Sequence, residues 1–492
     1  MELSLITLGA ALAMQVTLAP CTIEGVAGPA RCGSYKVWED RGAKAGRQIE
    51  LSIVILSALE AARPDPFFML QGGPGDAPSF NARFYSRVFQ DIRGTRDLVL
   101  IDLRGTGKSS ALTCPELAKP AADGVYDADL LSVPAVRACR ERLAQRADLR
   151  LYTTEIVVDD LEELRQALGY GPINLYGTSY GSRVAQVYMR RYPKSLRAVA
   201  MKGIAPPSMA MPASHASAGE DAWRALVARC ANEPGCARAF PTLDADFRQL
   251  LARLEKTSPM RTFPANAKRA KVTRGLFAEA FRRVLYTPEG WAQAPKRIRQ
   301  LLNDDELALA ETALSGRGMF GGERLAGGFF LSVTCTEDVP YLPADADAKA
   351  AGTFGGPYRL EQQRAACREW PRGSVSADHR RPTLSAVPTL LLSGELDPVT
   401  PPSGGEEVAR GLANGRHVVV RNNGHPIGNA EHCIGQMIGE FLDRGSATGI
   451  DARCAAAVPA PPFVLPGREN QSGQPSFRAL ALILNPIDQG AQ

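Results

Sequence analysis

Six short runs of aliphatic or aromatic residues have the character of buried strands. They occupy residues 67–70, 98–103, 173–176, 198–201, 389–392 and 418–420. Each ends near Gly, Asp or Asn, as buried strands do where they enter a loop. Helical patterns lie between them: Val157, Leu161, Leu164 and Leu168 recur at helical spacing and form one apolar face. The alternation predicts an α/β protein with a mostly parallel sheet and right-handed crossovers.

The alternation of strands and helices stops in the middle of the chain. Amphipathic helical segments are found there at residues 223–230, 247–254, 276–285, 291–302 and 307–314. They are followed by a stretch with six glycines, residues 316–328, which is either a mobile loop or the hinge of a lid. The strand pattern resumes after about residue 385. We predict one α/β domain, formed by residues 14–205 and 386–450, with a mainly helical cap, residues 206–385, inserted before its later strands. Residues 451–492 are rich in Pro and Gly, and we predict that they wrap the surface.

The composition excludes several classes of protein. With 492 residues, of which 45% are hydrophobic and 22% charged, the chain has enough apolar material for a large core and is not predominantly disordered. The net charge of +5 results from 57 basic and 52 acidic side chains and is not gathered into a basic stripe, so we expect no nucleic-acid partner. No apolar stretch reaches the roughly 18 to 20 residues that a membrane-spanning helix needs, so we expect no membrane span.

The N-terminus has features of an export signal. Residues 3–14 are apolar, and Ala11-Leu12-Ala13 resembles a signal-peptidase site. Glu2 departs from the pattern because secretory signals carry Lys or Arg there, and a buried N-terminal strand is the alternative. We predict a signal peptide at residues 1–13 and a protein that is secreted or periplasmic.

The motif Gly177-Thr-Ser179-Tyr-Gly181 lies between the predicted strand at 173–176 and a helical segment at 182–192. In a nucleophile elbow, a serine sits on a strained strand-to-helix turn whose flanking glycines avoid steric clashes. The turn exposes the serine hydroxyl and directs the next backbone N–H, here that of Tyr180, toward a developing oxyanion. The motif is weak as a pattern of letters, but its position between strand and helix predicts that Ser179 is a nucleophile.

A nucleophilic serine needs a base and an acid at the ends of later strands. Asp397 follows the strand predicted at 389–392, and His425 follows the strand predicted at 418–420. His417 precedes its strand and so lies at the opposite end of the sheet. Glu395 is the competing carboxylate. The order serine, acid, histidine predicts Ser179, Asp397 and His425 as a catalytic triad.

Two glycine-containing loops follow the first two predicted strands. Gly72-Gly73, after residues 67–70, allows close approach to a reacting carbonyl, and Gly73 (or Gly72) is predicted to supply a second oxyanion N–H; an ordinary Gly-Pro turn is the alternative. The second loop contains Gly107-Lys-Ser, but a phosphate-binding loop needs a glycine where this chain has Asp102. We expect a buried pair of Asp102 and Arg104 to brace the active-site loops instead.

Five motifs occur in an order that resembles a known family. They are Gln71-Gly-Gly-Pro-Gly, Asp102-Leu-Arg-Gly-Thr-Gly-Lys-Ser, Gly177-Thr-Ser-Tyr-Gly-Ser, Gly394-Glu-Leu-Asp-Pro-Val-Thr-Pro-Pro and Asn423-Gly-His. Together they resemble the α/β-hydrolase serine peptidases of the prolyl iminopeptidase and tripeptidyl aminopeptidase group, and the cysteine-containing segments resemble its secreted tripeptidyl branch. The likeness covers about residues 20 to 465. Leu103, where these proteins usually have Gln, and Gln71, where the iminopeptidases have His, depart from the pattern.

The resemblance implies an α/β-hydrolase fold and release of one or a few residues from the free N-terminus of a peptide. Carboxylates of the cap would then capture the substrate amine, and Glu337 and Asp338, where the insertion returns to the core, are the candidates; the alternative is that they are surface acids. We expect neither cofactor nor metal, because no metal-type spacing of His and Cys is present. An esterase or amidase of small non-peptide substrates and a non-catalytic binding protein remain alternatives. Oligomeric state is left open.

The ten cysteines are an even number, and none lies at a predicted triad position. The simplest hypothesis pairs them sequentially as Cys21–Cys32, Cys114–Cys139, Cys230–Cys236, Cys335–Cys367 and Cys433–Cys454. Sequence alone does not fix the connectivity, and buried free thiols are the alternative. Disulfides at these positions would brace an exported enzyme.

Overall fold

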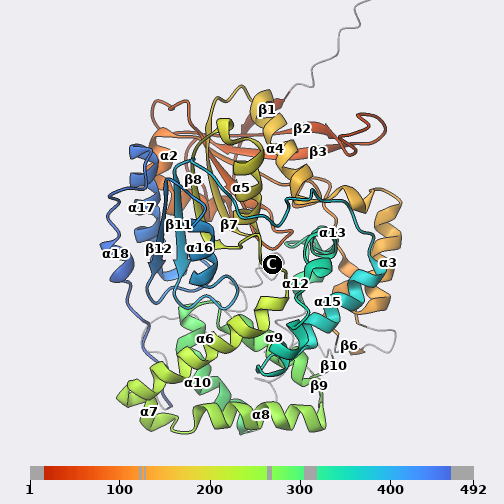
Figure 1. The fold of residues 1–492 in the computed structure, drawn as a ribbon, viewed down its shortest axis with the longest axis vertical. Coiled ribbons are helices and arrows are strands. Elements are labelled where there is room, and N and C mark those ends of the chain that lie inside the picture. Colours follow the sequence, from red (N-terminus) through yellow and green to blue (C-terminus); the bar gives the residue numbers. More distant parts are fainter. Residues whose placement is uncertain (1–15, 121–124, 127–128, 263–268, 304–317, 467–492) are drawn as a thin grey trace, which may run out of the picture.

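The computed structural model describes residues 16–120, 125–126, 129–262, 269–303 and 318–466. The predicted signal peptide and the helix predicted at 307–314 lie outside these residues. A nine-stranded sheet forms the centre of the molecule (Figure 1). Its strands are β1 (Thr17–Cys21), β2 (Ala30–Trp38), β3 (Gln48–Leu56), β4 (Phe67–Leu70), β5 (Leu98–Ile101), β7 (Ile173–Ser179), β8 (Leu196–Ile204), β11 (Thr389–Gly394) and β12 (Gly415–Val420).

The sheet is mostly parallel, as the sequence predicts. Its strand order is β1-β2-β3-β5-β4-β7-β8-β11-β12, and every neighbouring pair from β5 to β12 is parallel. The three N-terminal strands are antiparallel to their neighbours and were not expected. In β2 buried, half-buried and exposed positions are mixed, so this strand lacks the continuous apolar run that marks a strand covered on both faces.

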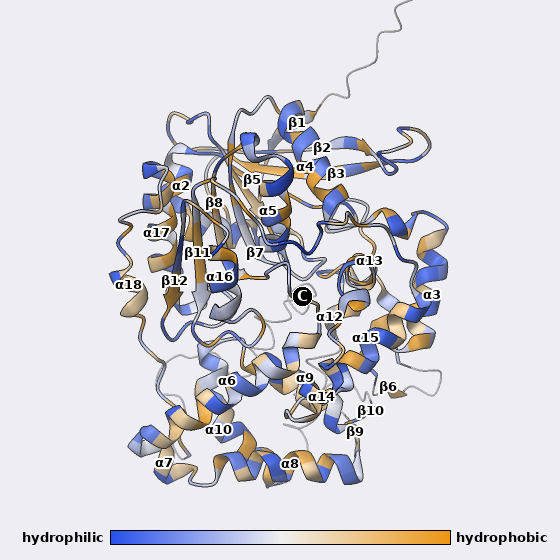
Figure 2. Ribbon diagram, viewed as in Figure 1, coloured by the Kyte–Doolittle hydropathy of each residue, from blue (hydrophilic) through white to orange (hydrophobic). Residues whose placement is uncertain are grey.

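Helices cover both faces of the sheet. On one face lie α4 (Thr154–Ala167), α5 (Tyr180–Arg191) and α16 (Pro402–Ala409), and on the other lie α1 (Ala82–Val88), α2 (Gln90–Thr95) and α17 (Glu431–Arg444). Two further helices, α3 (Val133–Ala144) and α18 (Arg453–Ala456), lie at the periphery (Figure 1). The strands are apolar and the outer surfaces of these helices polar, so two hydrophobic cores lie between the layers (Figure 2).

The described residues between β8 and β11 form the cap. Its helices are α6 (Ala213–Asn232), α7 (Pro234–Ala239), α8 (Leu243–Thr257), α9 (Arg274–Val284), α10 (Pro288–Leu302), α12 (Gly318–Gly321), α13 (Gly327–Glu337), α14 (Ala346–Ala351) and α15 (Tyr358–Glu369). Strands β9 (Met260–Thr262) and β10 (Arg269–Lys271) join β6 (Val125–Tyr126) in a small sheet. The cap has its own core, in which Trp223, Phe247 and Phe281 pack against one another. The predicted α/β core with a mainly helical cap is confirmed.

In its described part, the glycine-rich stretch is a loop only at residues 322–326 and is otherwise helical. Residues 318–321 form α12, and α13 begins at Gly327. A Cβ atom on Gly321 would lie 2.3 Å from the backbone nitrogen of Ala118, and one on Gly328 would lie 2.6 Å from the carbonyl oxygen of Leu112. These two glycines therefore allow the cap helices to pack closely on the core.

The ten cysteines form five disulfides in the sequential order. The bonds are Cys21–Cys32, Cys114–Cys139, Cys230–Cys236, Cys335–Cys367 and Cys433–Cys454. The last one fastens the beginning of the C-terminal tail to α17, and the tail then reaches the cap, where the N–H of Val464 donates to the carbonyl of Ala292 at 3.0 Å. Within the described ranges, no helix combines the length and the apolar character needed to cross a bilayer.

Candidate active site

Ser179 lies at the sharp turn between β7 and α5. Its backbone has φ 55° and ψ −122°, a left-handed conformation that is strained for a residue with a side chain. The flanking glycines are required by close contacts: a Cβ atom on Gly181 would lie 2.2 Å from the carbonyl oxygen of Leu70, and one on Gly177 would lie 2.5 Å from the carbonyl oxygen of Gly181. This geometry is that of a nucleophile elbow. The N–H of Tyr180 is in the first turn of α5, where helical N–H groups have no intrahelical acceptor.

Asp397 and His425 follow β11 and β12 and are hydrogen-bonded to each other. The Nδ1 atom of His425 lies 2.8 Å from Oδ2 and 3.0 Å from Oδ1 of Asp397. Burial opposes ionisation of Asp397, but His425, Lys202 and the N–H of Thr400 outweigh it and lower its pKa to about 2. Asp397 is therefore a carboxylate that orients the imidazole. Glu395, the competing acid, is exposed and accepts from the N–H of Asn422.

Two further residues hold the triad loops, and sequence reasoning did not single them out. The Thr400 hydroxyl donates to Oδ2 of Asp397 at 2.7 Å and lies 3.2 Å from Nδ1 of His425. The buried Lys202, on β8, donates to the carbonyls of Gly424 at 2.9 Å and His425 at 3.1 Å, and burial lowers its pKa to about 8. Both contacts fix the position from which His425 faces the nucleophile.

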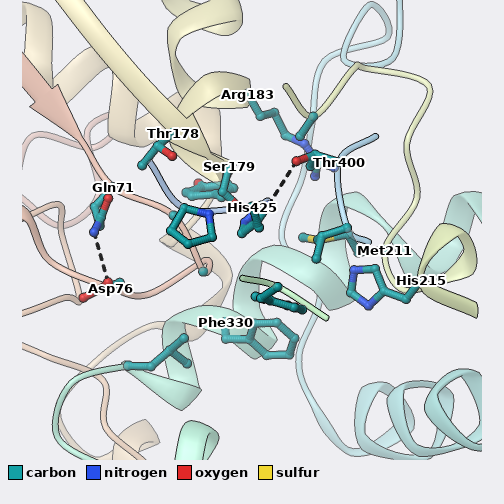
Figure 3. A pocket seen from close by; sticks show the side chains of 18 of the residues that line it. Gln71, Asp76, Thr178, Ser179, Arg183, Met211, His215, Phe330, Thr400 and His425 are labelled. Carbon is teal, nitrogen blue, oxygen red and sulfur yellow. Dashed lines mark hydrogen bonds between the residues drawn. The ribbon is translucent and has the colours of Figure 1, made fainter. Parts of the chain in front are cut away.

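The loop after β4 lies directly against Ser179. A Cβ atom on Gly72 would lie 2.8 Å from Cβ and 3.2 Å from Oγ of Ser179, so only glycine permits this approach. Gly73 has φ 109°, a conformation that favours glycine. Gly73, Tyr180, Ser179 and His425 line one cavity, and Figure 3 shows the Ser179 and His425 side chains next to each other. This arrangement suits backbone donors on both sides of a reacting carbonyl.

The loop after β5 is braced differently from the sequence prediction. Asp102 and Arg104 are buried, but they do not pair with each other. Asp102 accepts from the N–H and hydroxyl of Ser79 and from the N–H of Lys108. Arg104 instead pairs with Asp160 of α4 at 2.8 Å. Each residue ties this loop to a different neighbour, because the two side chains leave the strand end in different directions.

The cavity above Ser179 has a volume of about 320 Å³ and is covered by the cap. Part of its lining is apolar: Met209, Met211, Phe320, Leu325 and Phe330. The rest includes two acids, Asp76 and Glu279, four arginines, Arg183, Arg282, Arg324 and Arg359, and one further histidine, His215. In the view of Figure 3, Gln71 and Asp76 lie on one side of Ser179 and His425, and Met211 and His215 lie on the other. The cavity wall is therefore partly apolar and partly charged.

Glu337 and Asp338 are not where the sequence prediction requires them. Both are fully buried at the end of α13 and do not line the cavity. Glu337 accepts from the N–H and hydroxyl of Thr154, both at 2.6 Å, and Asp338 pairs with Arg183 at 3.0 Å. Helix α13 is buried on all sides, so its last residues point into the protein and join the cap to α4 and α5.

Glu279 is the cap carboxylate that does line the cavity. Burial opposes its ionisation, but Arg282, at 2.6 Å, together with Arg359, lowers its pKa to about 2. For Asp76, burial dominates and raises the pKa. Glu279 is therefore a buried, ionised acid in the cavity wall. Sequence reasoning missed it because Glu279 lies on an amphipathic helix, where a charged residue is expected on the solvent-exposed face.

Comparison with known proteins agrees with this geometry. A family model described as the alpha/beta hydrolase fold matches residues 65–428. The chain belongs to the α/β-hydrolase family. Three relatives each match over most of both lengths. The serine protease Hip1 of Mycobacterium tuberculosis is 24% identical over 87% of this chain and 88% of its own length. The tripeptidyl aminopeptidase of Streptomyces coelicolor is 23% identical over 88% of this chain and 84% of its own length. The carboxylesterase B of Mycobacterium tuberculosis is 25% identical over 87% of this chain and 86% of its own length.

These relatives and the family model identify this α/β-hydrolase as a serine hydrolase, and the predicted kinship with peptidases of the family is confirmed. Its five disulfides are typical of proteins in oxidising compartments.

Proposed function

We propose that this protein is an exported serine peptidase that releases a short unit, a single residue or a tripeptide, from the free N-terminus of peptides. One arrangement carries the proposal: Ser179 on its elbow, the His425–Asp397 pair beside it, and the buried, ionised Glu279 all border the same cavity. A cavity beneath the cap that contains a carboxylate suits a chain end that bears an ammonium group.

The chemistry would be acyl transfer through an ester of Ser179. His425 removes the proton of the serine hydroxyl as the oxygen attacks the peptide carbonyl, and Asp397 holds the imidazolium that forms. The N–H groups of Gly73 (or Gly72) and Tyr180 bind the oxyanion. Each donor stabilises the transition state by about 3 to 4 kcal/mol. His425 then protonates the leaving amine. Water, activated by the same histidine, hydrolyses the ester and restores Ser179.

Glu279 would bind the substrate's α-ammonium group. Its carboxylate already accepts from Arg282, at 2.6 and 3.1 Å, and has lone pairs left for a further donor. Glu279 comes from α9, and the residues that follow this helix reach the triad: the N–H of His425 donates to the carbonyl of Tyr286 at 2.8 Å. A fixed distance between ammonium site and nucleophile would set the number of residues released.

The decisive test compares free and blocked substrates. Alanyl and tripeptidyl 4-nitroanilides are measured beside their N-acetylated forms, with the Ser179→Ala variant as the inactive control. The proposal predicts that acetylation lowers kcat/KM at least tenfold, because it removes the charge that Glu279 binds. Equal rates for free and acetylated substrates would refute the aminopeptidase assignment.

A carboxylesterase acting on small non-peptide substrates is the second candidate. The apolar part of the lining, which includes Met209, Met211 and Phe330, favours it, as does the similarity to carboxylesterase B. The same triad hydrolyses esters and amides, so the fold does not separate the two activities. Preference for simple 4-nitrophenyl esters over every anilide with a free amine would support the esterase.

A further inference from the structure

The arginines of the cavity differ in whether an acid neutralises them. Arg183 pairs with Asp338 at 3.0 Å, Arg282 with Glu279 at 2.6 Å, and Arg324 with Asp76 at 3.7 Å. For Arg359, the fourth arginine of the lining, no carboxylate among the described residues lies within ion-pairing distance. Because a buried charge is costly unless it is paired, an arginine of this kind beside a cavity points to an anion that is supplied from outside.

The surroundings of Arg359 hold it in place, and the nearby Glu279, already paired with Arg282, compensates its charge only in part. Its side chain is 7% exposed, donates to the side-chain oxygen of Gln363 at 2.9 Å, and stacks over the rings of Phe320 and Phe330 at 5.2 and 5.7 Å. An amide oxygen and two aromatic faces orient a guanidinium but leave its positive charge in place. Arg359 is therefore a fixed cation at the cavity wall.

His215 provides a second, independent observation. It is 9% exposed and lines the same cavity, yet neither ring nitrogen has a hydrogen-bond partner. Burial and the nearby Arg282 lower its pKa, so the ring is neutral and carries one N–H donor. Figure 3 shows the ring at the edge of the cavity, beyond Met211. A buried imidazole without a partner is costly unless a ligand provides one.

We propose that Arg359 and His215 together bind a carboxylate of the substrate, and that this carboxylate is an acidic side chain in the released N-terminal unit. The guanidinium supplies the charge, and the imidazole N–H supplies a second hydrogen bond. The inference rests on the proposed function, because it takes Glu279 as the acceptor of the substrate's ammonium group.

The position of Glu279 places the carboxylate in the N-terminal unit rather than in the leaving group. Arg359, His215, Arg282 and Glu279 also surround a second, small cavity of about 20 Å³ beside the first, so the four side chains form one cluster. A substrate whose ammonium group meets Glu279 has its first side chains next to Arg359. An N-terminal aspartate or glutamate would satisfy both charges of the cluster at once.

The test compares isosteric substrates that differ by one charge. Tripeptidyl 4-nitroanilides with N-terminal Asp or Asn, and with N-terminal Glu or Gln, are hydrolysed by the wild-type enzyme. We expect kcat/KM to favour the acidic member of at least one pair by about tenfold to a hundredfold, as for a charge-assisted hydrogen bond in a buried site. A ratio near one for both pairs in the wild type would overturn the proposal, and this measurement depends on no variant.

Variants then assign the preference to Arg359. We expect Arg359→Gln to reduce the acid-to-amide ratio to near one, and Arg359→Lys to retain part of it. Arg229→Gln is the matched control, because Arg229 also stacks on a phenylalanine, Phe463, at 4.6 Å, but does not line the cavity. An acid preference that survives in Arg359→Gln would overturn the assignment.

Two further arms separate this inference from the proposed function. Replacing 4-nitroaniline by 4-aminobenzoate places the carboxylate on the leaving side; a preference that follows this group would overturn the placement in the N-terminal unit. N-acetylating the Asp and Asn substrates tests the ammonium site alone. Equal rates after acetylation with an intact acid preference would refute the aminopeptidase and leave the carboxylate site standing.

Discussion

Replacing Gly72 by alanine tests whether the loop after β4 must lie against the nucleophile. The added Cβ atom would be 2.8 Å from Cβ and 3.2 Å from Oγ of Ser179. Non-bonded carbon atoms normally remain about 3.5 to 4.0 Å apart, so the loop or the serine has to move by roughly 1 Å. A displacement of about 1 Å in a catalytic site costs about a hundredfold in rate, and loss of an oxyanion donor costs about 10² to 10³. We therefore expect kcat/KM to fall at least a hundredfold.

The assay is hydrolysis of a free-amine tripeptidyl 4-nitroanilide, with urea unfolding measured on the same preparations. Gly171→Ala is the control, because a Cβ atom on Gly171 would meet nothing within 4 Å. We expect Gly171→Ala to keep wild-type activity. If Gly72→Ala retains more than about a third of the wild-type kcat/KM while folded, the loop does not position the oxyanion donor and the reasoning fails.

Three further predictions concern charge and crosslinks. We expect Glu279→Gln to lower kcat/KM for a free-amine tripeptidyl anilide about tenfold to a hundredfold and to leave the N-acetyl form unaffected; equal losses on both would contradict an ammonium site. Burial raises the pKa of Glu337 from 4.5 to about 7, so the folded state binds an extra proton between these values and wild-type stability is lost as pH rises through them. In urea unfolding, the free energy of unfolding of Glu337→Gln relative to that of the wild type should rise by about 3 kcal/mol between pH 4.5 and 7.5. A difference between the two proteins that does not change with pH would contradict this. The Cys335–Cys367 disulfide has a sequence separation of 32, and the Cys230–Cys236 disulfide has a separation of 6. In the loop-entropy description, removing the first should lower the free energy of unfolding by about 1.5 kcal/mol more than removing the second. Equal unfolding free energies for the two double-alanine variants would contradict this.

The parallel part of the sheet was predictable from the sequence because its strands are buried on both faces and read as uninterrupted apolar runs. β4 (Phe67–Leu70) has the predicted limits, and β11 (Thr389–Gly394) extends two residues beyond them. The antiparallel strands β1 to β3 were missed. β1 and β2 lack a continuous buried run, which hides the strand signal. β3 alternates polar and apolar residues from Gln48 and ends in the buried run Ile53–Leu56, a strand pattern that was overlooked.

The residues around the nucleophile were predictable because chain order and strand ends constrain them strongly. Asp397 and Glu395 both follow β11. The predicted acid, Asp397, is buried against His425, whereas Glu395 is exposed. Thr400 and Lys202 were not singled out, because a threonine in a loop and a lysine in a strand carry no signal of their own.

The cap residues of the cavity were not predictable, since helix packing alone decides which charged residues turn inward. Glu279 and Arg359 lie on separate helices, α9 and α15, and His215 lies on a third, α6. Glu337 was selected for its position where the cap returns to the core. In the structure, Glu337 ends a helix that is buried on all sides, so its side chain faces inward.

The central claim is that Ser179 forms a covalent ester during turnover. Mass spectrometry of the intact protein after reaction with a fluorophosphonate, followed by peptide mapping, tests it most directly. The account predicts one adduct per chain, on the peptide that contains Ser179, and none on the Ser179→Ala variant. No labelling of the active wild-type enzyme, or equal labelling of the Ser179→Ala variant, would contradict it.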